Sequence, residues 1–397
     1  MKKNTKFIWS MIFMIIGVSI GAGILGLPLE VGLSGFWPAI TGLILVWLLM
    51  LSVGWVYLYK FINSKESVND YAMLYQKELG RWAEFVNSIA YLFTFYCLMI
   101  AFISGASSTI VGIFPYLETI PFVVKYIDII FFIFATSVII FGMEFMSKFN
   151  TVLIVLLFTF FFVLLILIFP FFNTSYLSYQ KWSHVPFEMP ILVTAFGYHI
   201  VLPIIYKHSK ANKISNNGLI KILFTGTIIV LLVNILWAVV VLGVIPINSV
   251  DSVSITSAYK DGAPATVPIA KLTKTGSITF FALMFSLFAI VTSYIGVGAG
   301  VMSYIKDLTG QYFKRRNKLT DIIITFSLPL IIVLTYPNLF IKMLNIVGGI
   351  GIITSFGILP GIMALKKRNP SYIRFIGAFI LIFSIFIFII EFSTFIQ

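Results

Sequence analysis

Charged residues are scarce in this sequence of 397 residues: Asp, Glu, Lys and Arg make up only 10% of it, whereas apolar residues make up 60%. Soluble domains have about 25% charged residues, so this composition excludes a soluble globular protein. Stretches without any charge, such as 7–29, 31–59 and 85–117, exceed the roughly 20 residues that a bilayer-spanning helix needs. We therefore predict an all-α polytopic membrane protein.

Cysteine and histidine are also rare. The single Cys97 has no disulfide partner, and we expect it to be a small buried apolar residue. His184, His199 and His208 are scattered without metal-ligand spacing, so no metal and no cofactor is expected. An enzyme is not expected either, because membrane catalysis needs clustered acids, histidines or metal ligands, and only Glu30 and His199 are available.

The apolar runs predict eleven membrane spans. Their approximate bounds are 7–34, 36–60, 83–114, 122–146, 149–172, 187–206, 219–246, 277–305, 319–336, 339–365 and 372–395. The lysines before the first span resemble the start of a signal peptide. However, the apolar run is too long and lacks a small-residue cleavage site, so the first span is expected to remain as a helix.

Basic residues outnumber acidic ones by 27 to 14, and they are unevenly placed. If the N-terminus is cytoplasmic, 21 of the 27 basic residues fall on the cytoplasmic side, as the positive-inside rule requires. Eleven spans then put the C-terminus outside. The expected contacts of these charges are anionic lipid head groups rather than nucleic acid, and no protein partner is indicated.

Glycine and proline gather within the first span, in the sequence IGAGILGLP at 20–28. In a helix interior Gly costs about 1 kcal/mol relative to Ala, and Pro about 3 kcal/mol, so we predict an opened helix. Its freed backbone groups must line a protein-enclosed cavity, as in transporters that bind charged substrates at broken helices. The N–H groups of Gly21, Ala22 and Gly23 suit an anion, and the carbonyls near Gly17–Ile20 suit a cation. The alternative is close helix packing through small residues.

A second candidate break lies in the sixth span, from Thr194 to His199, with Pro203 behind it. Five spans separate the two starts, so the halves would be inverted relative to each other, which is typical of a midplane transport site. We expect a first five-helix repeat at 1–173, a second at 185–366 and an eleventh helix at 371–397. The two halves have no detectable residue-by-residue similarity.

Few polar residues remain as candidates for ion coupling. Intramembrane His199 either relays protons or orients the second break, and Glu30 is either a protonatable gate or a solvated carboxylate. The hydroxyls of Thr292 and Ser293 either complete an ion site or bond to their own helix. The ion-coupling candidates are Gly17, Ile20, Glu30, His199, Thr292 and Ser293.

Two connecting segments also carry expectations. Segment 247–276, with three prolines at 246, 264 and 268 in or beside it, is expected to fold over the extracellular entrance. Segment 60–82 mixes acidic and basic residues and is expected to contain a short interfacial helix.

Six short segments carry a family resemblance. They are IGAGILGLP at 20–28, LGR at 79–81, ISGA at 103–106, AFGYH at 195–199 with Pro203, FAIVTSYIGV at 288–297 and YPNLF at 336–340. In this order and spacing, they resemble the tryptophan/tyrosine permease branch of the bacterial hydroxy and aromatic amino acid permeases. The resemblance runs over nearly the whole chain and is strongest to the tyrosine-specific members.

The resemblance implies a five-plus-five inverted-repeat fold of the leucine-transporter type (APC superfamily) with an eleventh helix. It also implies proton-coupled uptake of an aromatic amino acid, with tyrosine favoured, across the bacterial cytoplasmic (inner) membrane. Together with the two breaks, it gives the expected substrate-binding residues Ser19, Gly21, Ala22, Gly23, Tyr96, Thr194, Phe196, Gly197 and His199.

The sequence departs from the family pattern at three positions. Ile200 and Val201 replace the small residues that usually follow the sixth-helix histidine, and Ser303 stands where related permeases often have Asp. A serine, threonine or other neutral amino acid transporter of the same fold, coupled to protons or sodium, is therefore the alternative. An amino acid sensor that does not transport is the alternative from another class.

Overall fold

The computed structural model describes residues 2–21, 23–63, 71–120, 122–141, 143–249, 253–312, 318–336 and 338–396. Within these ranges the chain forms helices joined by short turns and no β-strand, in agreement with the all-α prediction. The helices of the first half are α1 (Lys2–Ser19), α2 (Gly23–Gly32), α3 (Phe36–Asn63), α4 (Tyr71–Leu79), α5 (Arg81–Ile113), η1 (Pro115–Thr119), α6 (Val123–Ile140), α7 (Met143–Ile168), η2 (Phe169–Phe171) and η3 (Thr174–Ser178).

The second half contains two further irregular spans. Its helices are η4 (Trp182–His184), α8 (Val185–Ala195), η5 (Tyr198–Val201), α9 (Leu202–Ala211), α10 (Asn216–Val244), α11 (Ile255–Lys260), α12 (Thr266–Thr273), α13 (Gly276–Tyr312), α14 (Lys318–Thr335), α15 (Phe340–Ile346), η6 (Val347–Ile352), η7 (Thr354–Ile358), α16 (Leu359–Ala364) and α17 (Ser371–Ile396). Segments η6 and η7 are π-helical.

The number of spans differs from the predicted eleven. Among the described residues, nine helices are long and apolar enough to cross a membrane, or ten if the bent pair α1–α2 is one span. The remaining predicted span, 319–336, corresponds to the shorter apolar helix Leu319–Thr335. At 1.5 Å per residue, 17 residues reach only about 26 Å, less than the roughly 30 Å of a bilayer core.

The first span is broken where its glycines predicted an opening. Helices Thr5–Ser19 and Gly23–Gly32 are bent by 59° relative to each other. The sixth span is also irregular, because α8, η5 and α9 follow one another within it. Both interruptions lie in the interior of the protein, where Ile20, Gly21, Phe196 and Tyr198 are buried.

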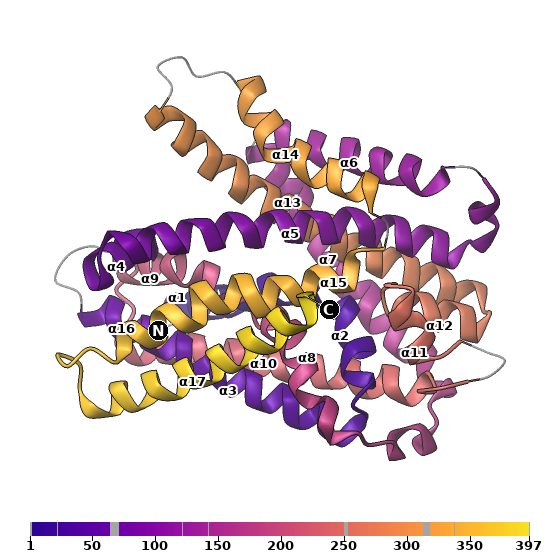
Figure 1. Cartoon of the computed structure of the whole chain (residues 1–397), viewed down its shortest axis with the longest axis horizontal. Coiled ribbons are helices and arrows are strands. Elements are labelled where there is room, and N and C mark those ends of the chain that lie inside the picture. Colours follow the sequence, from indigo (N-terminus) through magenta and orange to yellow (C-terminus); the bar gives the residue numbers. More distant parts are fainter. Residues whose placement is uncertain are drawn as a thin grey trace.

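The helices pack in two groups. Helix α13 packs on α5, α6, α7 and α14, whereas α1, α2, α3 and α8 pack with α10 or with each other. Figure 1 shows α6 and α14 on one side of the long helix α5, and α3, α10 and α17 on the other. Helix α5 also contacts η6, which in turn packs on α8.

Short helices mark the two ends of the molecule. Helix α4 lies at one end, and α11 and α12 lie at the other (Figure 1), so we call these the α4 end and the α12 end. A short helix in segment 60–82 was expected, and α4 is that helix. Helices α11 and α12 belong to segment 247–276, and the backbone N–H of Ala265 between them donates to Leu25 O in α2 (2.8 Å). This segment therefore contacts the second half of the first span.

Candidate functional site

The first break interrupts the hydrogen-bond ladder of the first span. Ile20 N–H still donates to Ile16 O four residues back (2.8 Å), but Ile24 N–H reaches only three residues back, to Gly21 O (3.2 Å). Ala22, one of the expected binding residues, lies outside the described residues. The break therefore separates two short helices whose facing ends carry backbone groups released from the regular ladder.

The second break follows the same logic in the sixth span. Gly197 N–H donates to Thr194 O (3.2 Å) and Tyr198 N–H to Phe196 O (2.9 Å), which replace the four-residue bonds of α8. Phe196 adopts φ −104° and ψ 24°, outside the helical region. Since Pro203 cannot donate a backbone hydrogen bond, the helix tightens into η5 before α9 begins.

The two breaks are in contact with each other. A Cβ placed on Gly23 would lie 3.7 Å from Thr194 Cγ2 and 3.8 Å from Ala195 Cα. Ser19, at the end of α1, is buried, and its hydroxyl oxygen has no hydrogen-bond partner among the described residues. The structure thus brings Gly23 against Thr194 and Ala195, and separately leaves the buried Ser19 hydroxyl at the end of α1 without a partner, which is costly unless a ligand binds there.

Helix α13 forms a third wall at the first break. A Cβ on Gly21 would collide with the Ser293 hydroxyl, so this hydroxyl faces the break. Thr292 instead donates to Phe288 O (2.8 Å) and Ala289 O (3.1 Å) of its own helix. The Thr292 hydroxyl is therefore bonded to its own helix, and the neighbouring Ser293 hydroxyl is the one next to Gly21.

Proline leaves carbonyls without their usual donors, and distant side chains supply new ones. Pro28 has no N–H for Ile24 O, and the indole N–H of the buried Trp237 in α10 donates to it (2.8 Å). Pro203 likewise has none for His199 O, which accepts from the N–H of Leu202 and from the Tyr71 hydroxyl of α4 (2.5 Å). Both broken spans are thus fixed by donors that lie far away in the sequence.

His199 is enclosed by aromatic rings. It stacks on Tyr198 (centroid distance 4.2 Å) and Phe356 (5.5 Å). Its Nε2 lies 2.9 Å from Met50 O, which also accepts the Tyr198 hydroxyl (2.9 Å). A carbonyl accepts only from a protonated nitrogen, so Nε2 carries the hydrogen. The fully buried imidazole, with Nδ1 unpaired among the described groups, ties the second break to α3.

Tyr96 of α5 is bonded to another helix. Its hydroxyl donates to Ile324 O in α14 (2.9 Å), and the side chain is half-buried. In this structure the hydroxyl is therefore bonded to α14, and a contribution of Tyr96 to the substrate site stays a prediction. On another face of α5, Thr94 contacts Gly351 of η6, where a Cβ would collide with its hydroxyl.

The first span borders open space at Gly17. A Cβ on Gly17 or on Gly296 of α13 would meet no atom within 4 Å. Gly17 is half-buried and Gly296 is exposed, although both lie within membrane-length helices. This leaves α1 free of close packing at Gly17, whereas its end at Ile20 is buried.

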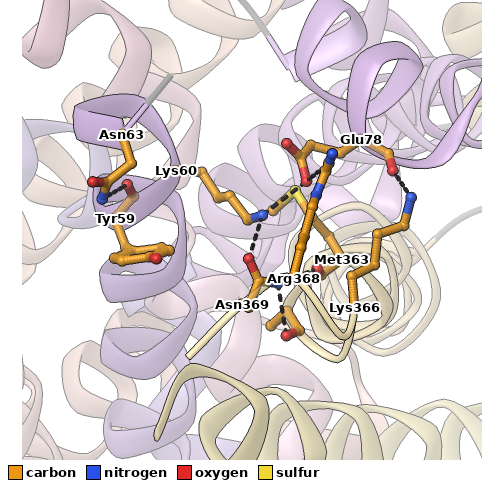
Figure 2. A network of polar contacts seen from close by, with 9 residues as sticks. Tyr59, Lys60, Asn63, Glu78, Met363, Lys366, Arg368 and Asn369 are labelled. Atoms are coloured by element: carbon orange, nitrogen blue, oxygen red, sulfur yellow. Dashed lines mark hydrogen bonds and ion pairs between the residues drawn. The ribbon is translucent and has the colours of Figure 1, made fainter. Parts of the chain in front are cut away.

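Side chains at the α4 end hold several elements together. Figure 2 shows Glu78 of α4 accepting from Lys60 of α3 (2.8 Å) and from Arg368 (2.6 Å) in the turn before α17. Lys60 also donates to Asn369 Oδ1 (2.8 Å). The Lys366 ammonium donates to the backbone carbonyl of Glu78. Helix α4 is thus linked to α3 and to the α16–α17 turn.

Tyrosines extend this connection into the interior. Tyr75 of α4 and Tyr57 of α3 both donate to Ser355 O, with 3.0 Å for Tyr57. In the π-helical register, Ser355 O would accept from residue 360, which is a proline without an N–H. Tyr57, Tyr75 and Tyr71 are all buried. These tyrosines were not predicted, because their one signal in the sequence is a carbonyl that a following proline leaves free.

A cavity of about 530 Å³ lies at the α12 end. Its lining includes Ser107 and Ser108 of α5, Glu118 of η1, and Asp261 and Lys271 of the α11–α12 segment. Pockets of about 300–1,000 Å³ are typical of small-molecule sites. Among the described residues, no three His, Cys, Asp or Glu side chains are grouped so that they could hold a metal ion.

Glu30 is buried in the last turns of α2, with 2% of its surface exposed. Its Oε2 accepts from the Asn345 amide (2.9 Å), and its Oε1 lies 3.9 Å from His184 Nε2. The alternative of a solvated carboxylate therefore does not hold, because protein groups replace the water around it.

The chain matches known proteins over almost its full length. The model of the tryptophan/tyrosine permease family matches residues 3–395. The chain is 28% identical to tyrosine-specific transport system 1 of Haemophilus influenzae over 84% of this chain and 82% of that protein. It is 26% identical to the low affinity tryptophan permease of Proteus vulgaris (90% and 86%) and 24% identical to glutamine transporter 2 of Aliivibrio fischeri (90% and 89%). This chain therefore belongs to the tryptophan/tyrosine permease family.

Proposed function

We propose that the protein imports an aromatic amino acid, most favourably tyrosine, together with protons by alternating access. The amino acid would lie between the two breaks, its carboxylate at the freed N–H groups near Gly23 and its ammonium at the carbonyls that end α1. Half-helix ends carry partial charges of the required signs. Helices α1–α2 and α8–α9 would then move against α5, α6, α13 and α14.

One observation carries this proposal: Gly23, at the first break, contacts Thr194 and Ala195 at the second. The unpaired Ser19 hydroxyl at the end of α1 supports it. Two broken spans that meet deep in a membrane-length bundle are suited to a small ligand with both charges. The names of the relatives indicate amino acids as cargo, and those of two name tyrosine and tryptophan.

We further propose two inverted five-helix repeats, 1–173 and 185–366, followed by the helix 371–397. The α4 end would face the cytoplasm and the α12 end the outside, as the positive-inside rule favours. In that orientation the cavity is an outer vestibule, and its lining carries charges of both signs, from Glu118, Asp261 and Lys271, as an amino acid does.

A second candidate is a transporter of a smaller neutral amino acid. The relative named as a glutamine transporter favours it, since that protein differs little in identity from the aromatic permeases. Ile200 and Val201, next to the second break, also favour it, because they are larger than the small residues that usually follow the sixth-helix histidine in related permeases.

Counterflow with purified protein in liposomes separates these candidates. Vesicles are preloaded with one unlabelled amino acid, and uptake of the same amino acid in labelled form is followed for tyrosine, glutamine and serine in turn. Proton and sodium gradients are then imposed separately. We expect counterflow with tyrosine, competition by tryptophan and phenylalanine, and accumulation only with an inward proton gradient. Counterflow with glutamine or serine but not tyrosine would instead favour the second candidate. Binding without counterflow of any amino acid would indicate a sensor.

A further inference from the structure

Two glutamates are buried near the α12 end, one on each broken span. Glu30 lies in α2, seven residues after Gly23, and Glu188 lies in the first turn of α8, six residues before Thr194. Their exposed fractions are 2% and 0%. At 1.5 Å per residue, each carboxyl group is only about 10 Å along its helix from the contact between the two breaks.

Glu188 has no hydrogen-bond partner for either carboxylate oxygen among the described residues. The Ser34 hydroxyl is near enough to interact with the Glu188 carboxyl group, but its hydrogen bond of good geometry goes to Val31 O (2.7 Å). On the other side the backbone of Gly42 is so close that a Cβ there would collide with Glu188 Oε1. The carboxyl group of Glu188 is therefore surrounded by protein atoms and close enough to Glu30 for their charges to repel.

Asn345 contacts Glu30 through one polar atom and has a second polar atom left for a further bond. Its Nδ2 donates to Glu30 Oε2 (2.9 Å), whereas its Oδ1 is unpaired among the described groups although only 9% of the residue is exposed. Because the amide N–H of Asn345 donates to the Glu30 carboxyl group, the amide carbonyl oxygen of Asn345 is also directed towards that part of the protein. This oxygen can accept a hydrogen bond from the O–H of a protonated carboxyl group, whereas a carboxylate has no hydrogen to donate to it.

The other charged groups around the pair do not neutralise it. Lys342 faces Glu391 of α17, His184 lies 3.9 Å from Glu30, and the phenol of Tyr259 in α11 also faces Glu30. The only charged residues of α3 and α10, Lys60 and Lys221, lie far along those helices, and no lysine or arginine forms an ion pair with Glu30 or Glu188 in the described part of the chain. Burial and the negative charges of Glu30 and Glu391 also raise the pKa of Tyr259, so this phenol stays neutral.

Physical chemistry then limits the charge of the pair. An isolated buried carboxylate is so costly that such groups usually remain protonated, and two neighbouring carboxylates disfavour each other's ionisation. We propose that Glu30 and Glu188 form the site of the transported proton, with Asn345 recognising the protonated form of Glu30. This proposal rests on the proposed transport function and names the coupling site within it.

Helix α15 connects this site with the substrate site. Asn345 contacts Glu30, and the adjacent residue Leu344 accepts a hydrogen bond from Thr194 Oγ1 (2.7 Å) at the second break. If the proton were lost, Glu30 and Glu188 would both be charged, and their repulsion would push α2 and α8 apart. Proton release and separation of the two broken spans are thereby linked.

The test compares Glu30→Gln and Glu188→Gln with wild type in liposomes that contain a pH-sensitive dye. Glutamine keeps the shape of a protonated glutamate, so both variants should keep tyrosine counterflow. Accumulation driven by an inward proton gradient should fall at least tenfold, and tyrosine-induced acidification of the lumen should disappear. Glu84→Gln is the control, since Glu84 is a half-buried acid in the first turn of α5, next to α4 and away from the pair, and it should keep proton flux.

The outcomes separate this proposal from the proposed function. Wild-type vesicles without counterflow of any amino acid would overturn the function. Wild-type counterflow with full proton-driven accumulation in both Gln variants would overturn only the proton site. Infrared spectroscopy provides a measurement that does not require the variants to transport. The band of a protonated carboxyl group should be present in wild type and weaker in both variants. An unchanged band would contradict the proposal.

Discussion

At the residue scale, the substrate site depends on backbone that side chains leave accessible. Gly23 faces Thr194 and Ala195 at ordinary contact distances, so one methyl group fits there but a larger side chain does not. Ser19 adds an unpaired hydroxyl, and the Ser293 hydroxyl lies against Gly21. The glycines are thus needed for a close approach between two spans, and not only for flexibility.

Gly23→Leu should abolish tyrosine binding, whereas Gly23→Ala should retain it with an affinity reduced about tenfold. The methyl group of alanine narrows the space between the breaks, and the leucine side chain fills it. Binding is measured by scintillation proximity on purified protein. Gly276→Leu is the control, because Gly276 is exposed and a Cβ there meets no atom within 4 Å. Unchanged affinity in Gly23→Leu would remove the basis for the proposed site.

His199 is expected to orient the second break rather than to carry protons. Its ring is stacked between Tyr198 and Phe356 and bonded to Met50 O. His199→Ala should therefore weaken tyrosine affinity and leave the pH profile of counterflow unchanged. A shift of that profile by a full pH unit would show that the imidazole takes part in proton transfer.

Trp237→Phe should lower the stability of the protein. The substitution keeps an aromatic ring but removes the N–H that satisfies Ile24 O, and an unsatisfied buried carbonyl costs about 1–3 kcal/mol. A lower melting temperature in detergent is expected, with Trp37→Phe as the exposed control. Equal melting temperatures for the two variants would mean that another donor, such as water, replaces the indole.

At the element scale, α4 connects most of the α4 end. It holds the second break through Tyr71, the π-helical span through Tyr75 and the α16–α17 turn through Glu78. Movement of α8–α9 during transport therefore requires that Tyr71 release His199 O. In the proposed orientation, α4 is the cytoplasmic closure of the pathway.

The link at Glu78 should weaken at acid pH. Burial alone would raise the pKa of Glu78, but hydrogen bonds and charges from Lys60 and Arg368 outweigh it and lower the pKa below 4.5. The stabilisation is therefore complete above the ordinary glutamate value and is lost as the pH falls through the lowered pKa. Hydrogen exchange of α4 amides, corrected for intrinsic rates, should increase only at such acid pH, and Glu78→Gln should raise it at neutral pH as well. Exchange that is equal in both proteins would contradict this role.

The sequence predicted the local features of this fold and little of what holds them in place. The glycines at 21–26 and Pro28 predicted the first break because their cost in a helix is local. Trp237 was not predicted, since it donates to a carbonyl 213 residues away. Asn345 and Glu188 were missed for the same reason. Tyr96 was assigned to the site by resemblance, but its hydroxyl bonds to α14.

At the scale of the whole molecule, the chain is a helical bundle in which two broken spans meet between groups of straighter helices. The cavity lies at the α12 end, and the polar links of α4 lie at the opposite end of the molecule (Figure 1). Such a layout suits alternating access, in which a central site opens to one side at a time. The tightly bonded α4 end would then have to open for release.

The most direct test of the central claim is whether tyrosine protects the contact between the two breaks. The only natural cysteine, Cys97, is buried, so Ser19→Cys and Thr194→Cys can be introduced after Cys97→Ser and labelled with a small maleimide. Micromolar to millimolar tyrosine should slow labelling at both positions and leave Gly276→Cys unaffected. Labelling of Ser19→Cys and Thr194→Cys that is unchanged by tyrosine, in protein that still transports it, would contradict a substrate site at the two breaks.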